Sequence, residues 1–220
     1  MNEKPLVSPV NEPDCELLEE IARLRQEILD LSELVATDVL TGLYNSRYFK
    51  NVLQTEMDRS KRTSVPTTLV MVDIDYLKAI NDTHGYEAGN TVLQHIATAL
   101  KDEVRTTDIV CRYGGGKFAI IFPETHLRLA VKVADRIRGI IAITPVPCNE
   151  GYISISVSMG ASVYIKTSML EVIDFVDSVN KYLYKAKQSG RNCIRLIDST
   201  DLRVVAEGIA DERGTLFNDE

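Results

Sequence analysis

The 220-residue sequence lacks an excess of positive charge, which argues against a general nucleic-acid-binding protein. It contains 25 Lys and Arg residues against 32 Asp and Glu residues, so its net charge is −7. Proteins that bind nucleic acid without sequence preference neutralise phosphates with clustered basic side chains. The composition offers no such excess, although a local basic site for a small anion is compatible with it.

Cysteines, secretion signals and long apolar runs are also scarce. Residues 1–14 contain neither an apolar segment nor a cleavage site, and no apolar run approaches the roughly 18 residues of a membrane-spanning helix. We therefore expect a cytoplasmic protein without membrane insertion. The cysteines show no C-x-x-C spacing and no histidine partners at zinc-site distances, so we expect free thiols in a reducing compartment. They are Cys15, Cys111, Cys148 and Cys193.

The N-terminal region predicts a disordered leader followed by a coiled-coil helix. Residues 1–14 contain three prolines among polar residues, a composition typical of disorder. In residues 15–36, β-branched a positions and leucine d positions favour a parallel homodimer. The alternative is an amphipathic helix packed on its own domain, since the pattern spans only about three heptads. The a and d positions are Leu17, Ile21, Leu24, Ile28, Leu31 and Val35.

From residue 37 onwards the pattern predicts one domain of alternating strands and helices. Three glycines, Gly114 to Gly116, separate two short apolar runs and predict a β-hairpin. The order of elements predicts a mixed, mainly antiparallel sheet flanked by helices over residues 37–198, followed by an acidic flexible tail at 199–220. We expect strands at residues 68–73, 109–113, 118–122, 152–164 and 193–197, and helices at 87–103, 127–143 and 170–188.

Four sequence motifs follow one another through this domain. They are D-V-L-T-G-L-Y-N-S-R-Y-F at residues 38–49, V-D-I-D-Y-L-K-A-I-N-D-T-H-G-Y-E-A-G-N at 72–90, R-Y-G-G-G-K-F at 112–118 and K-A-K-Q-S-G-R-N at 185–192. In this order they resemble the GGDEF, or diguanylate cyclase, family. The resemblance implies a palm-like α/β (α+β) fold. In intact members it also implies condensation of two GTP molecules into cyclic-di-GMP across a dimer of domains.

The signature hairpin departs from the family pattern at two positions. The resemblance assigns Mg²⁺ binding to Asp73 and to an acidic third position of the signature, which a glutamate follows. Gly116 and Lys117 stand at these two positions here. Attack of a ribose hydroxyl on a phosphate requires divalent metals that neutralise developing charge. A glycine offers no side-chain ligand and a lysine repels a cation, so we expect degenerate catalytic positions and almost no cyclase activity.

Metal binding is therefore expected to be weak. Asp73, even with Asp75 two residues further on, is a poor pair for holding two metal ions. We expect no required cofactor, with Mg²⁺ bound only if GTP binding or cyclase activity persists. Lys117 beside a phosphate could also stand in for a metal ion. The alternative is that Gly116 and Lys117 form a harmless hairpin tip and the metal site draws its ligands from elsewhere.

The resemblance also identifies remnants of a GTP site. Asn81 matches the residue that hydrogen-bonds the guanine edge, for which an amide has both donor and acceptor. Asn90 replaces its usual aspartate companion, so guanine recognition should weaken. Lys187 and Arg191 match a basic pair that contacts the triphosphate, and Lys78 belongs to the same cluster. For each basic residue the alternative is a solvated surface charge.

A second nucleotide site is predicted at residues 105–108, R-T-T-D. The family places an R-x-x-D site for its product, cyclic-di-GMP, at this interval before the signature. Arg105 would contact a phosphate or the guanine edge, and Asp108 would accept hydrogen bonds from guanine. Arg136 falls where the resemblance implies a supporting arginine. The alternative is a surface ion pair that contributes about 0–1 kcal/mol.

These patterns predict a catalytically degenerate GGDEF-domain protein that acts as a cyclic-di-GMP receptor or regulatory interaction module. Cyclic-di-GMP is the expected ligand, with GTP as a second candidate. A homodimer through residues 15–36 and an unidentified protein partner are expected as well. The first alternative is a diguanylate cyclase of weak or unorthodox activity. The second is a purely structural dimerisation and partner-binding module.

Overall fold

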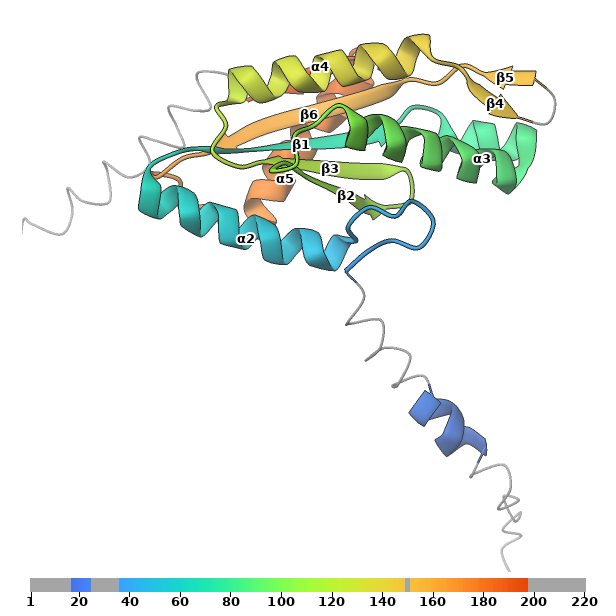
Figure 1. Ribbon diagram of the computed structural model, residues 1–220, viewed down its shortest axis with the longest axis horizontal. Coiled ribbons are helices and arrows are strands. Elements are labelled where there is room, and N and C mark those ends of the chain that lie inside the picture. Colours follow the sequence, from blue (N-terminus) through green and yellow to red (C-terminus); the bar gives the residue numbers. More distant parts are fainter. Residues whose placement is uncertain (1–16, 25–35, 149–150, 198–220) are drawn as a thin grey trace, which may run out of the picture. The chain divides into compact units, whose positions relative to one another are not determined.

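The computed structural model describes residues 17–24, 36–148 and 151–197 (Figure 1). The chain divides into two units, residues 1–36 and residues 37–220, and each is considered by itself.

The first unit contains a helical segment at residues 17–24, inside the region predicted as a coiled coil. Arg23 and Glu20 form an ion pair at 3.0 Å on this segment. The rest of the predicted coiled coil lies outside the described residues, as do the predicted leader and tail, so the coiled coil and its dimer stay predictions. The apolar side chains of the segment are exposed: Leu17, Leu18, Ile21 and Leu24.

The second unit follows the predicted alternation of strands and helices. Its helices are α2 (Ser46–Thr63), α3 (Leu77–Asp102), α4 (Leu127–Ile143) and α5 (Val172–Gln188). Its strands are β1 (Thr67–Ile74), β2 (Ile109–Gly114), β3 (Lys117–Phe122), β4 (Val146–Cys148), β5 (Gly151–Ile153), β6 (Val157–Tyr164) and β7 (Ile194–Leu196).

A five-stranded sheet in the order β2-β3-β1-β6-β7 forms the centre of this unit. Strand β1 pairs antiparallel with both β3 and β6, whereas β7 pairs parallel with β6. The mixed, mainly antiparallel sheet confirms the predicted fold class. Strands β4 and β5 form a separate two-stranded sheet.

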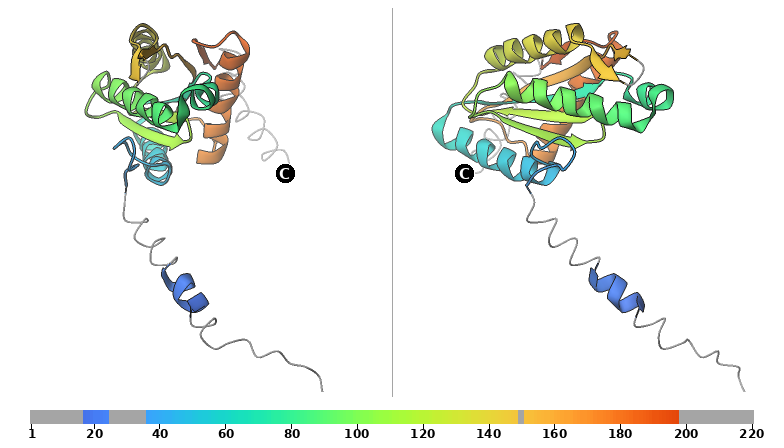
Figure 2. Two further views of the ribbon diagram at one scale, coloured as in Figure 1. Left: turned by 90° about the vertical axis from the view of Figure 1, so that its right-hand side faces the viewer. Right: turned by 45° about the vertical axis from the view of Figure 1, so that its right-hand side comes forward.

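Helices cover both faces of the large sheet. Along β1, Val70 and Val72 belong to one apolar core with residues of α3 and α4, while Leu69 and Met71 belong to a second core with α2 and α5. This division follows because successive side chains of a strand point to opposite faces. Figure 2 shows the two pairs of helices on either side of the sheet. As a result β1 is buried along its whole length, and its end at Asp73 and Ile74 lies between β3 and β6.

Helix α2 is missing from the sequence prediction. Its apolar residues Phe49, Leu53 and Met57 recur every fourth position and are buried, a spacing that predicts a helix. The side chain of Asn45 caps the helix by accepting hydrogen bonds from two backbone N–H groups of the first turn. Helix α3 also begins earlier than predicted, with a kink at Gly85, whose φ of 83° suits glycine.

The single strand predicted at residues 152–164 is wrong, because β5 and β6 lie in different sheets. Residues 154–156, between β5 and β6, belong to neither sheet. In this segment the hydroxyl of Ser156 donates to Asp75 Oδ2 at 2.7 Å. Gly160 lies inside β6. A Cβ at Gly160 would lie 2.3 Å from the backbone nitrogen of Leu183 on α5, so glycine permits the close packing of α5 on β6.

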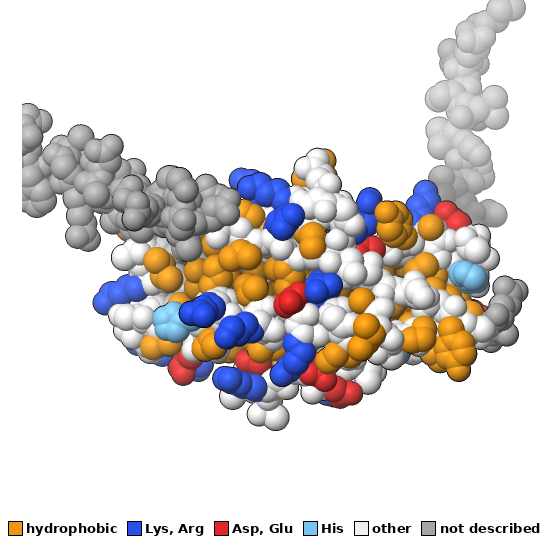
Figure 3. Space-filling view, turned by 90° about the horizontal axis from the view of Figure 1, so that it is seen from above, with side chains coloured by type: hydrophobic (Ala, Val, Ile, Leu, Met, Phe, Trp, Pro, Cys, Tyr) orange, Lys and Arg blue, Asp and Glu red, His pale blue; other side chains and the backbone are white. Residues whose placement is uncertain are grey.

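Charged side chains are distributed over the face seen in Figure 3, and the described cysteines are free thiols. Viewed from above in Figure 3, single Lys and Arg side chains are spread among apolar and uncharged ones. None of the described helices is both long and apolar enough to span a bilayer. Cys111, Cys148 and Cys193 are free thiols, as predicted, while Cys15 lies outside the described residues. Burial raises the pKa of Cys111 to about 12.

Candidate functional site

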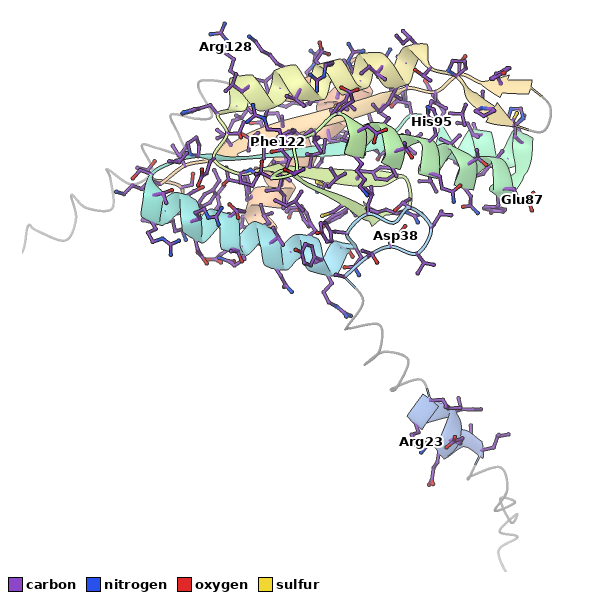
Figure 4. All side chains as sticks on the ribbon, viewed as in Figure 1. Arg23, Asp38, Glu87, His95, Phe122 and Arg128 are labelled. Carbon is purple, nitrogen blue, oxygen red and sulfur yellow. The ribbon has the colours of Figure 1, made fainter. Side chains whose placement is uncertain are left out.

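The loop before α2 braces the β2–β3 hairpin. Asp38 Oδ1 accepts hydrogen bonds from the backbone N–H and the hydroxyl of Thr41, at 2.9 and 2.7 Å. Arg112 Nη1 donates to both carboxylate oxygens of Asp38 at 3.1 Å. Arg112 also donates to the carbonyl oxygen of Gly115, through Nε at 3.3 Å and Nη2 at 3.1 Å. The hairpin turn is thereby tied to the loop that carries Asp38, which is labelled in Figure 4.

The pKa of Asp38 reflects this arrangement. Burial of the carboxyl group acts to raise the pKa, but the hydrogen bonds from Thr41 and Arg112 and the charge of Arg112 together lower it below its usual value. The folded protein therefore stabilises the ionised form of Asp38.

The hairpin tip lies against the end of β1. Gly114 and Gly115 have φ values of 144° and 56°, which explains two of the three glycines. Gly116 shows no such conformation; its carbonyl oxygen accepts a hydrogen bond from the backbone N–H of Ile74 at 3.1 Å. A Cβ at Gly116 would lie 2.7 Å from Leu77 Cδ2, so the Leu77 side chain occupies space that an acidic residue would need.

Asp73 is paired with a lysine rather than with a second carboxylate. Lys187 Nζ, from the last turn of α5, lies 2.7 Å from Asp73 Oδ2. The strand register places Asp73 directly opposite Lys117. Directly opposed residues of an antiparallel pair have Cβ atoms about 4.5–5.5 Å apart on one face of the sheet. The buried carboxylate of Asp73 thus has an ammonium group bound to it and a second lysine across the strand pair.

Asp75 has a structural role. Its carboxylate accepts hydrogen bonds from the hydroxyls of Ser156 and Ser158, both at 2.7 Å, and from the backbone N–H of Asn192 at 3.1 Å. These bonds join β1 to β6 and to the loop after α5. Asp75 is therefore already saturated with donors and makes a poor metal ligand.

The Mg²⁺ that the resemblance implies finds few ligands in this arrangement. Asp73 is ion-paired, Asp75 is hydrogen-bonded on both oxygens, and Gly116 has no side chain. Across the described ranges, no group of three or more His, Cys, Asp or Glu side chains could hold a metal ion. Because Mg²⁺ requires oxygen ligands in near-octahedral geometry, the residues present do not fit it.

The remaining GTP-site candidates surround the end of β1. The guanidinium carbon of Arg191 lies 4.4 Å from the ring centroid of Tyr76, which precedes α3. Lys78 follows on the first turn of α3 and is exposed. The loop after α5, which carries Arg191, and the start of α3 are thus in contact.

Asn81 and Asn90 lie on either side of the kink in α3. The side chain of Asn81 fills the space above Gly89, where a Cβ would lie 1.8 Å from Asn81 Oδ1. This oxygen is buried and has no hydrogen-bond partner within the described part of the chain. Asn90 is exposed. The proposed contacts of both residues with guanine stay predictions.

The R-x-x-D segment forms a tight turn between α3 and β2. Asp108 Oδ2 accepts a hydrogen bond from the backbone N–H of Arg105 at 3.0 Å, and the N–H of Asp108 donates to the Arg105 carbonyl oxygen at 3.0 Å. Burial raises the pKa of Asp108, although its interactions with Arg105 oppose the rise. Within the described residues, the second oxygen of the Asp108 carboxylate accepts no hydrogen bond from the protein.

Arg105 and Asp108 line a common pocket of about 360 Å³. Lys101, at the end of α3, adds a second positive charge to this pocket, and Tyr44 adds an aromatic ring that stacks on Tyr48 with centroids 4.1 Å apart. The complete lining is Thr37, Gly42, Leu43, Tyr44, Lys101, Val104, Arg105, Thr106, Asp108 and Val110.

Arg136 is not part of this lining. Its Nη2 donates to the carbonyl oxygen of Glu103 at 2.6 Å, and its Nε lies 3.0 Å from Glu103 Oε2. Arg136 thus contacts the segment just before the R-x-x-D turn instead of facing the pocket. Sequence reasoning named Arg105 and Asp108 but missed Lys101, Asp38 and Arg112, although the last two lie within quoted motifs.

Comparison with known proteins identifies relatives of this domain. The sequence profile described as "Diguanylate cyclase, GGDEF domain" matches residues 35–193. The response regulator PleD of Caulobacter vibrioides is 35% identical over 174 residues, which cover 78% of this chain and 38% of PleD. The chain therefore spans well under half of the length of that relative.

Two solved structures are similar as well. The diguanylate cyclase SiaD of Pseudomonas aeruginosa, in complex with its activator SiaC, has a TM-score of 0.71 at 31% identity, covering 84% of this chain and 74% of SiaD. The GGDEF domain of DgcB from Caulobacter crescentus, in complex with c-di-GMP, has a TM-score of 0.71 at 25% identity, covering 74% of this chain and 94% of that domain.

Proposed function

Because the chain belongs to the GGDEF family of diguanylate cyclase domains, we propose that it is a cyclic-di-GMP receptor with a degenerate cyclase site. The observation that carries this proposal is the shared pocket of Arg105 and Asp108, about 360 Å³ in volume. Pockets for small molecules commonly measure about 300–1,000 Å³. The complex of the DgcB GGDEF domain with c-di-GMP supports the same ligand class.

The pocket has the chemistry to recognise a guanine dinucleotide. The planar guanidinium of Arg105 can donate two parallel hydrogen bonds to a phosphate or to guanine O6 and N7. Lys101 supplies a further positive charge for a phosphate. The Asp108 carboxylate keeps one oxygen for the N–H donors of guanine, while its other oxygen holds the turn in shape. Arg136 would support the turn by its contacts with Glu103 and would not touch the ligand.

The degenerate cyclase site follows from charge and ligand supply. Cyclisation requires metal ions to neutralise the α-phosphate and to activate the attacking hydroxyl. Here Gly116 contributes no ligand, Lys117 is positive, and Asp73 is neutralised by Lys187 at 2.7 Å. Loss of such metal-centred stabilisation lowers the rate by orders of magnitude.

A receptor also needs a way to report its ligand. We expect the predicted homodimer of residues 15–36 to bring two domains together, so that ligand binding shifts a population of domain arrangements. An unidentified protein partner would then read that change. The complex of SiaD with its activator SiaC is an example of a related protein with a protein partner.

Isothermal titration calorimetry with cyclic-di-GMP tests the receptor function. The wild type should bind, and Arg105→Ala should weaken binding by about tenfold to a hundredfold, because a hydrogen bond to a charged group contributes about 1.5–3 kcal/mol. The matched control is Arg128→Ala, which removes an exposed arginine of α4 outside the pocket (Figure 4). Absence of binding by the wild type would exclude the receptor function and leave the weak cyclase and the purely structural module. Equal affinity of both variants would exclude the pocket.

A further inference from the structure

The end of β1 carries a concentration of positive charge where the family resemblance implies a divalent cation. We propose that this site binds nucleoside polyphosphates through its basic side chains and without a divalent cation. The site is separate from the Arg105–Asp108 pocket, so the inference does not depend on the receptor function. It develops the possibility raised by the sequence that Lys117 stands in for a metal ion beside a phosphate.

Asp73 is already paired with Lys187. The ammonium group of Lys187 lies 2.7 Å from Asp73 Oδ2 and would compete with a metal ion for that carboxylate. The side chain of Asp73 is buried, and Lys187 neutralises its charge within the protein. Asp73 therefore needs no external cation to balance its charge. A divalent cation would have to displace Lys187 and then remain next to it.

The position of Lys117 favours binding of a phosphate group. It lies opposite Asp73 in the β1–β3 register and is exposed. Among residues 36–148 and 151–197 its ammonium group forms no ion pair, in contrast to Lys187. Lys117 therefore presents three N–H donors to solvent beside a carboxylate that is already neutral. An incoming phosphate group is the natural acceptor for them.

The formal charges near the end of β1 sum to a positive value. Arg191 stacks on Tyr76, and Lys78 follows Tyr76 by two residues, so both lie close to the segment that leaves β1. Taken together, Asp73, Asp75, Lys78, Lys117, Lys187 and Arg191 carry two negative and four positive formal charges, an excess of two positive charges. Such a site attracts a polyphosphate and repels Mg²⁺.

Equilibrium titration with GTP and with inorganic tripolyphosphate, in EDTA and in excess Mg²⁺, tests this inference. Both ligands should bind the full chain in EDTA, and Mg²⁺ should weaken binding because it masks the phosphate charges. Lys117→Met should weaken metal-free binding by about tenfold or more, since a charge-assisted hydrogen bond is lost. Lys50→Met, at an exposed lysine of α2, is the matched control and should bind as the wild type does.

A charge-reversed variant gives a second readout. Gly116→Glu combined with Lys117→Glu should abolish binding in EDTA and make GTP binding depend on Mg²⁺. The single variant Lys117→Glu avoids the contact with Leu77 and should also lose metal-free binding. Binding of cyclic-di-GMP by the same samples shows that the variants are folded and that the other pocket is intact. Binding of GTP only with Mg²⁺, equal binding by Lys117→Met, or no binding of either probe would overturn the inference.

Discussion

At the scale of single residues, ion pairs fix the candidate sites, and the pair between Asp38 and Arg112 illustrates this most clearly. Asp38 accepts hydrogen bonds from Thr41 and from Arg112, and Arg112 holds the carbonyl oxygen of the hairpin residue Gly115. The geometry of the hairpin tip therefore depends on a carboxylate in a loop distant in sequence. The same logic applies to Asp73, whose charge is taken up by Lys187.

The pH dependence of stability should report the Asp38 carboxylate. Its folded-state pKa is lowered, so its stabilisation is present above the unfolded pKa of about 3.9 and disappears as the pH falls through the folded pKa. Asp38→Asn should lower the free energy of unfolding at pH 7 by about 1–3 kcal/mol. Urea titrations from neutral to acidic pH check this, with the exposed Asp58→Asn as control. An equal loss at pH 7 and below pH 3 would contradict an effect of charge.

Sequence reasoning could name these residues but could not pair them. Asp73, Lys187, Arg105 and Asp108 all follow from motifs, because the resemblance aligns each position with a known one. The ion pair of Asp73 with Lys187 joins a strand end to the end of α5, and only the folded topology brings these together. Lys101 belongs to no quoted motif, so its place in the pocket had no sequence signal.

At the scale of elements, the central strand and the hairpin were predictable, whereas the short strands were not. The apolar run at residues 68–73 predicted β1 because a strand buried on both faces needs apolar side chains throughout. The glycines of the β2–β3 turn were equally informative. Strands β5 and β6 form one alternating sequence, and the hydrogen bonds of Ser156 and Ser158 to Asp75 are long-range contacts that no local pattern shows.

Gly160 makes the contact between β6 and α5 possible. A Cβ there would lie 2.3 Å from the Leu183 backbone nitrogen and 2.4 Å from the Val179 carbonyl oxygen. Gly160→Ala should therefore push α5 away from β6 and cost about 1–3 kcal/mol of unfolding free energy. Gly139→Ala on α4, where a Cβ would have no heavy atom within 4 Å, should be neutral or slightly stabilising. Equal melting temperatures of the two variants would contradict this account of the packing.

At the scale of the whole molecule, the GGDEF fold is present, and two lysines lie next to Asp73 at the end of β1. The sheet order and the buried β1 bring Asp73, Lys117 and Lys187 together at one end of the sheet. At that end Gly116 supplies no carboxylate and Lys117 supplies a positive charge, while Arg105 and Asp108 line a pocket on another part of the domain. We infer a division between a lost reaction and a retained binding function.

Product formation from GTP tests this central claim most directly. The full chain is incubated with GTP and Mg²⁺, and cyclic-di-GMP is quantified by liquid chromatography against a sample without protein. We predict no product above that background, in the same preparation that binds added cyclic-di-GMP. Sustained formation of cyclic-di-GMP that disappears in Asp73→Ala would contradict the account and show that the domain is an active cyclase despite Gly116 and Lys117.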